Sequence, residues 1–265
     1  MPVDLSRYAP DGTKRPARRL FVIGDSSGGG LAAATLLALH EQQQQQQQRP
    51  HMTSSTSSEE EEPRQLDTPL LPVAGLCSIS GWFDMSCRAS TYRTRRWRDR
   101  TKRGDPVFKS GDARQERKGT LEMVFSYLGS VETAATEQPT ASPIFASRAT
   151  LGAAMPPTLV LVGDEEVVLE DSTRWAEALD NAGVSVALEV FPRMWHDWVM
   201  YSEGCGDREP GEGEEESAEA LPLSGKARPL KEAEVALAHV AAFFRSQPVP
   251  TLAQVSIPEG LTPAS

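Results

Sequence analysis

The chain has 265 residues, 39% of them hydrophobic, and a formal net charge of −10 at pH 7. This length fits one large α/β domain or two small ones, and no apolar run reaches the roughly 18 residues that a membrane span needs. The negative charge gathers in two polar stretches, residues 59–62 and 203–219, so it does not mark an acidic binding face.

The first predicted elements are a strand over residues 19–23 and a helix over residues 28–41. The helix is apolar on nearly all sides, which predicts that it is buried. A polar loop is predicted before the strand, over residues 1–17. A glutamine tract extends the helix, and residues 42–68 as a whole are too polar to pack a core. They are predicted to be a low-complexity surface insertion.

The sequence GDSSGG, residues 24–29, lies between this strand and this helix. A Gly-x-Ser-x-Gly turn in that context favours a nucleophile elbow, in which a strained turn lifts the Ser26 hydroxyl out of the sheet. The turn needs little side chain at Gly24 and Gly28. The alternatives are a plain glycine-rich turn and a phosphate-binding loop, but the spacings typical of dinucleotide and P-loop sites are missing.

A second buried strand is predicted over residues 73–80 and an amphipathic helix over residues 113–129. Between them, residues 92–103 hold seven basic side chains with Tyr92 and Trp97 interleaved. Such a cluster can bind nucleic acid. One short cluster without a nucleic-acid-binding fold favours the other interpretation, a solvated face or a loop over the active site.

The second half of the chain continues the alternation of strands and helices. The predicted elements are a loop over residues 133–155, strands over 158–162 and 184–191, helices over 171–182 and 231–245, an acidic insertion over 202–230 and a tail over 246–265. This order predicts the α/β class, with a parallel sheet flanked by helices and one domain over residues 18–245.

Three candidate catalytic groups follow strands of this predicted sheet: Ser26, the acids of residues 163–171, and His196. Because functional residues collect at the carboxyl ends of parallel strands, we expect these groups to meet. The order serine, acid, histidine is the order of α/β-hydrolases. In that chemistry the serine attacks a carbonyl, the histidine moves its proton, and the acid orients the imidazole. A structural role for His196 is the alternative.

Four segments resemble one known family. Residues 24–29 match its GDSAGG box with serine for alanine, residues 80–84 resemble its S-P-W-x-D strand end, residues 156–171 resemble PPxLxxxGxxExLxxD, and residues 194–196 resemble the box of the family histidine. The chain thus resembles the hormone-sensitive-lipase branch of the α/β-hydrolases, the GDxGG esterases. The resemblance implies a carboxylic ester hydrolase that works through an acyl-serine, without metal or cofactor.

The resemblance also implies the site residues. Ser26 would be the nucleophile and His196 the base. The register on residues 169–171 places the acid at Glu166, with Asp164 as the alternative. Gly24 and Gly28 would shape the elbow, and the Ser27 N–H would be one oxyanion donor.

One family feature is missing, the His-Gly-Gly-Gly stretch upstream of the serine that supplies the main oxyanion donors. We therefore expect only the carboxyl-terminal part of the fold. The strand over residues 19–23 would then lack its upstream partner, and two copies could associate through that edge. The alternative function is a catalytically impaired, hydrolase-fold binding or regulatory protein. The pattern does not separate ester from amide hydrolysis.

Cysteine usage and the N-terminus bear on location. Three cysteines, odd in number and without metal-ligand spacing, indicate a reducing compartment, and residues 1–19 lack the apolar core of a secretory signal. We expect a cytoplasmic protein that acts on a small-molecule ester. No nucleic-acid partner and no stable membrane insertion are expected.

Overall fold

The computed structural model describes residues 19–48, 73–98, 100–101, 103–109, 113–201 and 230–248. The predicted loop over residues 1–17, most of both low-complexity insertions and most of the predicted tail lie outside these ranges.

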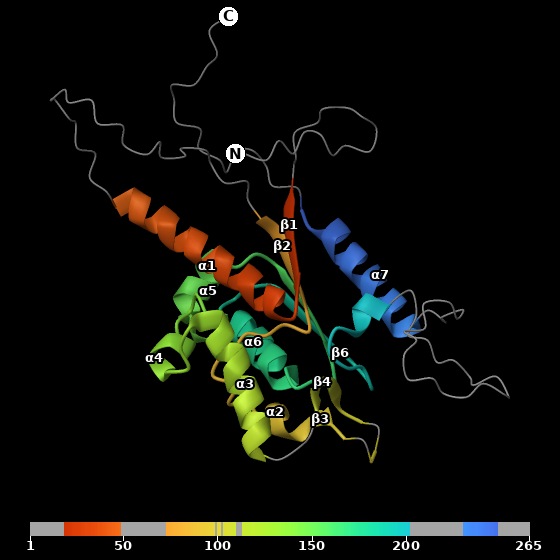
Figure 1. Ribbon diagram of the computed structural model, residues 1–265. Coiled ribbons are helices and arrows are strands. Elements are labelled where there is room, and N and C mark those ends of the chain that lie inside the picture. The colour runs from red at the N-terminus through yellow and green to blue at the C-terminus, as the bar shows by residue number, and fades with distance from the viewer. Residues whose placement is uncertain are drawn as a thin grey trace, which may run out of the picture.

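The described part is built on a sheet of four parallel strands (Figure 1). In spatial order these are β1 (Leu20–Asp25), β2 (Val73–Ile79), β5 (Thr158–Gly163) and β6 (Val186–Phe191), and every neighbouring pair is parallel. The two central strands are almost wholly buried, which is why they read as unbroken apolar runs. The predicted parallel sheet with flanking helices is confirmed.

Helices lie on both faces of the sheet, with α1 and α6 on one side and α7 on the other (Figure 1). The helices are α1 (Ser27–Gln48), α2 (Thr91–Thr94), α3 (Ala113–Leu128), α4 (Thr133–Thr136), α5 (Arg148–Ala154), α6 (Leu169–Asn181) and α7 (Lys231–Ser246), with 3₁₀ turns at Pro143–Phe145 and Trp198–Tyr201. Among the described helices, none is both long enough and apolar enough to cross a membrane.

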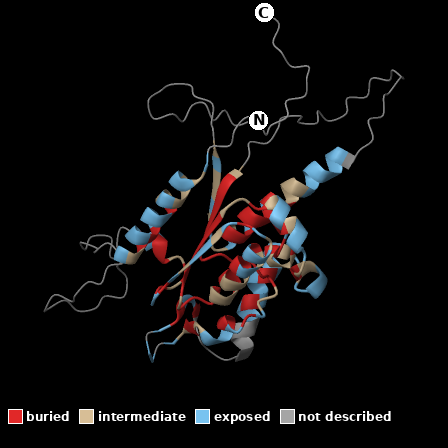
Figure 2. Cartoon of the chain, turned by 180° about the vertical axis from the view of Figure 1, so that it is seen from behind, coloured by how far each residue is buried: buried red, intermediate tan, exposed pale blue. Residues whose placement is uncertain are grey.

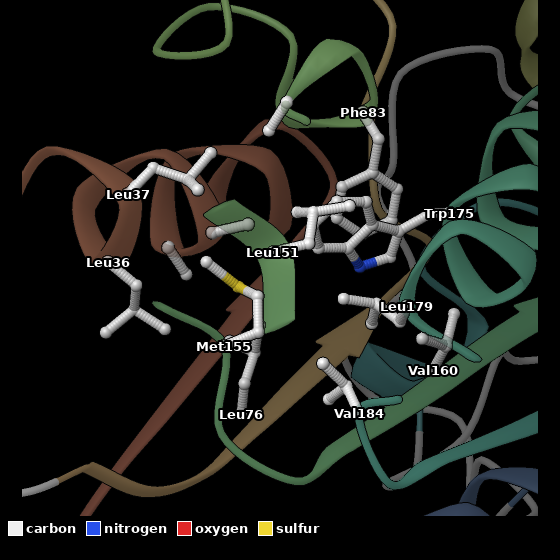
Figure 3. Close-up of a cluster of buried hydrophobic side chains, with 13 residues drawn as sticks. Leu36, Leu37, Leu76, Phe83, Leu151, Met155, Val160, Trp175, Leu179 and Val184 are labelled. Carbon is white, nitrogen blue, oxygen red and sulfur yellow. The ribbon is translucent and has the colours of Figure 1, made fainter. Parts of the chain in front are cut away.

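The sheet separates two apolar clusters. Successive side chains along each strand point to opposite faces, so they belong alternately to one cluster and the other. Leu76 and Val160 face α1, α5 and α6, where Phe83 and Trp175 stack with ring centroids 4.9 Å apart (Figure 3). Their strand neighbours, such as Cys77, face α7 on the opposite side. The buried strands and inner helix faces form the interior, while much of α7 is exposed (Figure 2).

The prediction that α1 is buried on nearly all sides was wrong at Leu31, which is 53% exposed. Ala33 and Leu37 on the inner face have no exposed surface. The segment is so rich in glycine, alanine and leucine that both helix faces look apolar in the sequence, although only the inner face is buried. The glutamines extend the helix as predicted, and residues 42–47 are exposed.

The predicted loop over residues 133–155 was also wrong, because it contains α4, a 3₁₀ turn and α5. Ser147 caps α5 by accepting a 3.1 Å hydrogen bond from the Thr150 N–H. A small second sheet, β3 (Arg96–Trp97) with β4 (Asp105–Lys109), forms within and just after the basic cluster and was not predicted.

Two of the three cysteines lie in the described residues, and both are free thiols. Burial, with smaller contributions from nearby carboxylates, raises the pKa of Cys77 and of Cys87 to about 12. Both therefore stay protonated and unreactive at neutral pH.

Candidate active site

Ser26 occupies the turn between β1 and α1 with a φ of 53°, in the left-handed region. Its backbone is held by three hydrogen bonds. The Ser26 N–H donates to the Ile79 carbonyl at 2.9 Å, and the Ser26 carbonyl accepts from Trp82 at 3.0 Å and Gly29 at 3.1 Å. The end of β2 thus fixes the strained turn that presents the hydroxyl.

Close backbone approach explains some of the elbow glycines. A Cβ on Gly24 would overlap the Gly28 carbonyl, and one on Gly30 would overlap the Trp82 carbonyl, so neither position has room for a side chain. Gly28 itself has no neighbouring atom within 4 Å of where its Cβ would lie. The expectation that Gly28 must be free of a side chain is therefore wrong, while the one for Gly24 agrees with the packing.

His196 lies in the loop after β6 and reaches Ser26. Its Nε2 is 2.8 Å from the Ser26 Oγ, and its Nδ1 is 3.1 Å from Glu166 Oε2. The ring is 6% exposed, and Phe108 of β4 meets it edge-on at a centroid distance of 6.2 Å. The structure therefore brings the three residues together in the order serine, histidine, acid.

Glu166 lies in the loop after β5 and has no exposed surface. Its Oε1 accepts hydrogen bonds from the Gly163 N–H at 2.6 Å and from the Ser80 hydroxyl at 2.9 Å. These bonds leave Oε2 facing the imidazole. Asp164, the alternative acid, instead accepts from the Arg193 N–H, so of the two predicted acids the structure places Glu166 at the histidine.

Ser80 joins the two loops and was not predicted to belong to the site. Besides donating to Glu166, its hydroxyl accepts a 3.0 Å hydrogen bond from the N–H of Asp197. Both Ser80 and Asp197 have positive φ angles, 51° and 58°. A signal was available for Ser80, since it begins the SGWFD segment that resembles a family box.

Four carboxylate and imidazole groups set the electrostatics. Burial raises the pKa of Glu166 to about 7, against the opposing hydrogen bond and charge of His196. Burial would lower the pKa of His196, but the hydrogen bond and charge of Glu166, with Asp197 and Asp105, raise it to about 9. The two groups titrate as a coupled pair in which the Glu166 carboxylate favours the imidazolium form, and His196 must be neutral before it can act as a base.

Two further acids lie near the imidazole. Asp197 Oδ2 is 3.5 Å from Nε2, and Asp105 Oδ2 is 3.9 Å from Nδ1. Sequence reasoning missed both, because Asp197 stands outside the acidic loop and Asp105 lies in an element that was not predicted. In the described ranges no group of three or more His, Cys, Asp and Glu side chains is placed to hold a metal ion.

A cleft of about 530 Å³ opens beside the elbow. It is lined by Ser27, Trp82, Gly119, Glu122, Met123, Ser126 and Tyr127. Five of these follow the helical spacing of one face of α3, and Ser27 is the neighbour of Ser26. The cleft therefore lies between α3 and the residue that follows Ser26, while Ser26 and His196 are not among its lining residues.

The chain is similar to known hydrolases over part of their length. It is 32% identical to an acetyl-hydrolase of Streptomyces hygroscopicus over 138 residues, which are 52% of this chain and 39% of that protein. It matches the crystal structure of an esterase/lipase from an uncultured bacterium at 25% identity with a TM-score of 0.55, covering 91% of this chain and 57% of that one.

The fold is also that of an esterase from the bacterial hormone-sensitive lipase family, at 24% identity, a TM-score of 0.53 and coverage of 86% of this chain and 52% of that one. The chain thus spans 39% to 57% of the length of these three proteins. Residues 8–200 match the family model described as alpha/beta hydrolase fold. The predicted family resemblance is confirmed, and the chain belongs to the α/β-hydrolase-fold family.

Proposed function

We propose that the protein hydrolyses a small-molecule carboxylic ester through an acyl-Ser26 intermediate. One observation carries the proposal, the continuous contact from Ser26 Oγ to His196 Nε2 at 2.8 Å and from His196 Nδ1 to Glu166 Oε2 at 3.1 Å. This is the geometry that the serine, histidine and acid mechanism needs.

In the proposed reaction, neutral His196 accepts the Ser26 proton as Oγ bonds to the ester carbonyl carbon. The imidazolium returns the proton to the leaving alcohol as the C–O bond breaks, which leaves the acyl-enzyme. Water, activated by His196, then releases the acid and restores Ser26. The Ser27 N–H is a first-turn amide of α1 without an intrahelical acceptor, and it supports the developing oxyanion.

The proposed substrates carry short or medium acyl groups. The similarity to a protein named acetyl-hydrolase supports an acetyl ester, and the cleft beside Ser27 supports a partly apolar substrate. Residues 18–245 are proposed as the catalytic domain, with the two low-complexity stretches as insertions. A cytoplasmic location stays a prediction.

The test is covalent labelling with a fluorophosphonate probe and hydrolysis of p-nitrophenyl acetate. Ser26→Ala should abolish labelling, whereas Ser185→Ala, which changes an exposed serine before β6, should not. Labelling that survives in Ser26→Ala would contradict the assignment of the nucleophile.

The acid is tested with a matched pair. Glu166→Gln should slow labelling by roughly tenfold or more but less than His196→Ala does, since an orienting carboxylate contributes less than the base. Asp164→Asn should have little effect, because its carboxylate contacts the Arg193 backbone. If Asp164→Asn lowered the labelling rate more than Glu166→Gln does, Asp164 and not Glu166 would be the acid that orients His196.

A second candidate function is a hydrolase-fold binding or regulatory protein. One observation favours it: the 265 residues contain no His-Gly-Gly-Gly stretch. Loss of an oxyanion donor typically costs about 10²- to 10³-fold in rate. A labelled Ser26 without turnover of p-nitrophenyl acetate would support this candidate, and turnover abolished by Ser26→Ala would reject it.

A further inference from the structure

The short strand β4 and the residues around it contact the acid loop and the histidine at three points. Arg103, just before β4, forms an ion pair with Glu165, the neighbour of the acid. Asp105 accepts a 3.2 Å hydrogen bond from the Val167 N–H on the other side of the acid. Phe108 meets the His196 ring edge-on. The segment over residues 103–108 thus contacts both His196 and the loop that carries Glu166.

Asp105 is the central member of this segment, with no exposed surface. Its Oδ1 accepts from the Val107 N–H at 3.1 Å, and its own N–H donates to the Arg95 carbonyl at 2.7 Å. Its Oδ2, besides accepting from Val167, lies 3.9 Å from Nδ1 of His196. The imidazole nitrogen that faces Glu166 therefore faces a second buried carboxylate as well.

We propose that Asp105 is a positioning residue that holds the acid loop through Val167 and stabilises the imidazolium form of His196 beside Glu166. The proposal rests on the proposed function, in which His196 becomes charged during each proton transfer. Asp105 does not touch the reacting atoms and acts through His196 and Glu166.

Stabilisation of the His196 imidazolium requires the negative charge of Asp105, whereas holding the backbone of the acid loop requires only a hydrogen-bond acceptor. A neutral amide oxygen could accept one of the two backbone N–H groups that Asp105 accepts, but it carries no charge, and a buried carboxylate is costly unless a positive group compensates it. Burial raises the pKa of Asp105, and the positive charge of His196 is the largest of the effects that oppose the rise, ahead of Arg96. The imidazole, 3.9 Å away, is thus one of the positive partners of this carboxylate, beside Arg96.

Several described charged groups near the His196 imidazole affect its pKa. Glu166 faces it from the loop after β5, Asp105 from β4, and Asp197 from its own loop. Arg96 of β3 lies near Asp105, and Asp25 acts on Asp197. Arg103 forms its ion pair with Glu165.

The first test measures the pKa of His196 by NMR titration of its imidazole signals, which needs no turnover. Asp105→Asn should lower that pKa by about one unit, a tenfold change in the protonation equilibrium. Asp164→Asn is the matched control, since it removes an acid of the same loop that does not face the ring. A folded Asp105→Asn protein with an unchanged His196 pKa would overturn the proposal.

The second test does not depend on the folding of Asp105→Asn. With Asp105 intact, the same titration of Glu166→Gln should still find the His196 pKa above the ordinary imidazole value of about 6.5, because a carboxylate remains beside Nδ1. A His196 pKa below that value in Glu166→Gln would also overturn the proposal. An unlabelled wild-type protein would instead reject the proposed function, and the titration would still report on Asp105.

Discussion

Ser80 and Glu166, 86 residues apart in the chain, are joined by a 2.9 Å hydrogen bond from the serine hydroxyl to Oε1 of the carboxylate. The same hydroxyl accepts from the N–H of Asp197, directly after His196. One buried side chain at the end of β2 therefore connects the loop of the acid with the loop of the base.

Replacing Ser80 should disturb both loops at once. We expect Ser80→Ala to slow probe labelling by roughly tenfold, because Glu166 keeps only the Gly163 N–H on Oε1 and the loss of a hydrogen bond to a charged group costs about 1.5–3 kcal/mol. Ser78→Ala is the matched control on the same strand, since the buried Ser78 hydroxyl has no hydrogen-bond partner within the described residues. Equal losses in the two variants would contradict this role of Ser80.

The rate should rise with pH. His196 accepts the Ser26 proton only in its neutral form. Burial lowers its pKa, but Glu166, with Asp197 and Asp105, raises it to about 9. Between about pH 7, above which Glu166 is ionised, and that pH the labelling rate should climb by about tenfold per pH unit, and above it the rate should level off. The check is the pH profile of labelling between pH 6 and about 10. A plateau that is already reached near pH 7 would contradict the raised pKa.

The elbow glycines should differ in their tolerance of alanine. Gly24→Ala should lower the free energy of unfolding by about 1–3 kcal/mol, because its Cβ would overlap the Gly28 carbonyl. Gly28→Ala should be neutral or stabilising by up to about 1 kcal/mol, because its Cβ meets open space on a helix. Thermal unfolding of both variants makes the comparison, and equal melting temperatures would refute it.

The β1 edge is expected to promote self-association. Among the described strands, β1 lies at one end of the sheet and pairs only with β2, and Ile23 on it is 52% exposed. Ile23→Lys should shift the protein toward the monomer in light-scattering measurements after size exclusion. Val190→Lys on the opposite end strand β6 is the control. Dissociation by the β6 variant alone would place the contact there instead.

The sequence was enough to predict the parallel sheet, because β2 and β5 are buried on both faces and so read as continuous apolar runs. It also indicated Ser26, Glu166 and His196 as site candidates, because each lies in a loop directly after a strand. The carboxyl ends of parallel strands meet at one edge, so chain order alone suggested their proximity.

The environment of the histidine could not be predicted in the same way. β3 and β4 are short and partly charged, so no periodic pattern marks them, and they are defined by their pairing with each other. The bond from Val167 to Asp105 spans 62 residues and has no local signature. The helix α5 was missed for a different reason. Its Ser147 cap was readable, but a segment rich in alanine, serine and proline favoured a loop.

The glutamine end of α1 has a consequence for how the chain tolerates repeat expansion. The helix is anchored at its first turns, where Gly30 packs on Trp82, whereas residues 42–47 are exposed on the helix surface. Each added glutamine would lengthen the helix by about 1.5 Å and rotate its exit point by about 100°. Variation in tract length would therefore change where α1 ends and leave the nucleophile turn, at the opposite end, unchanged.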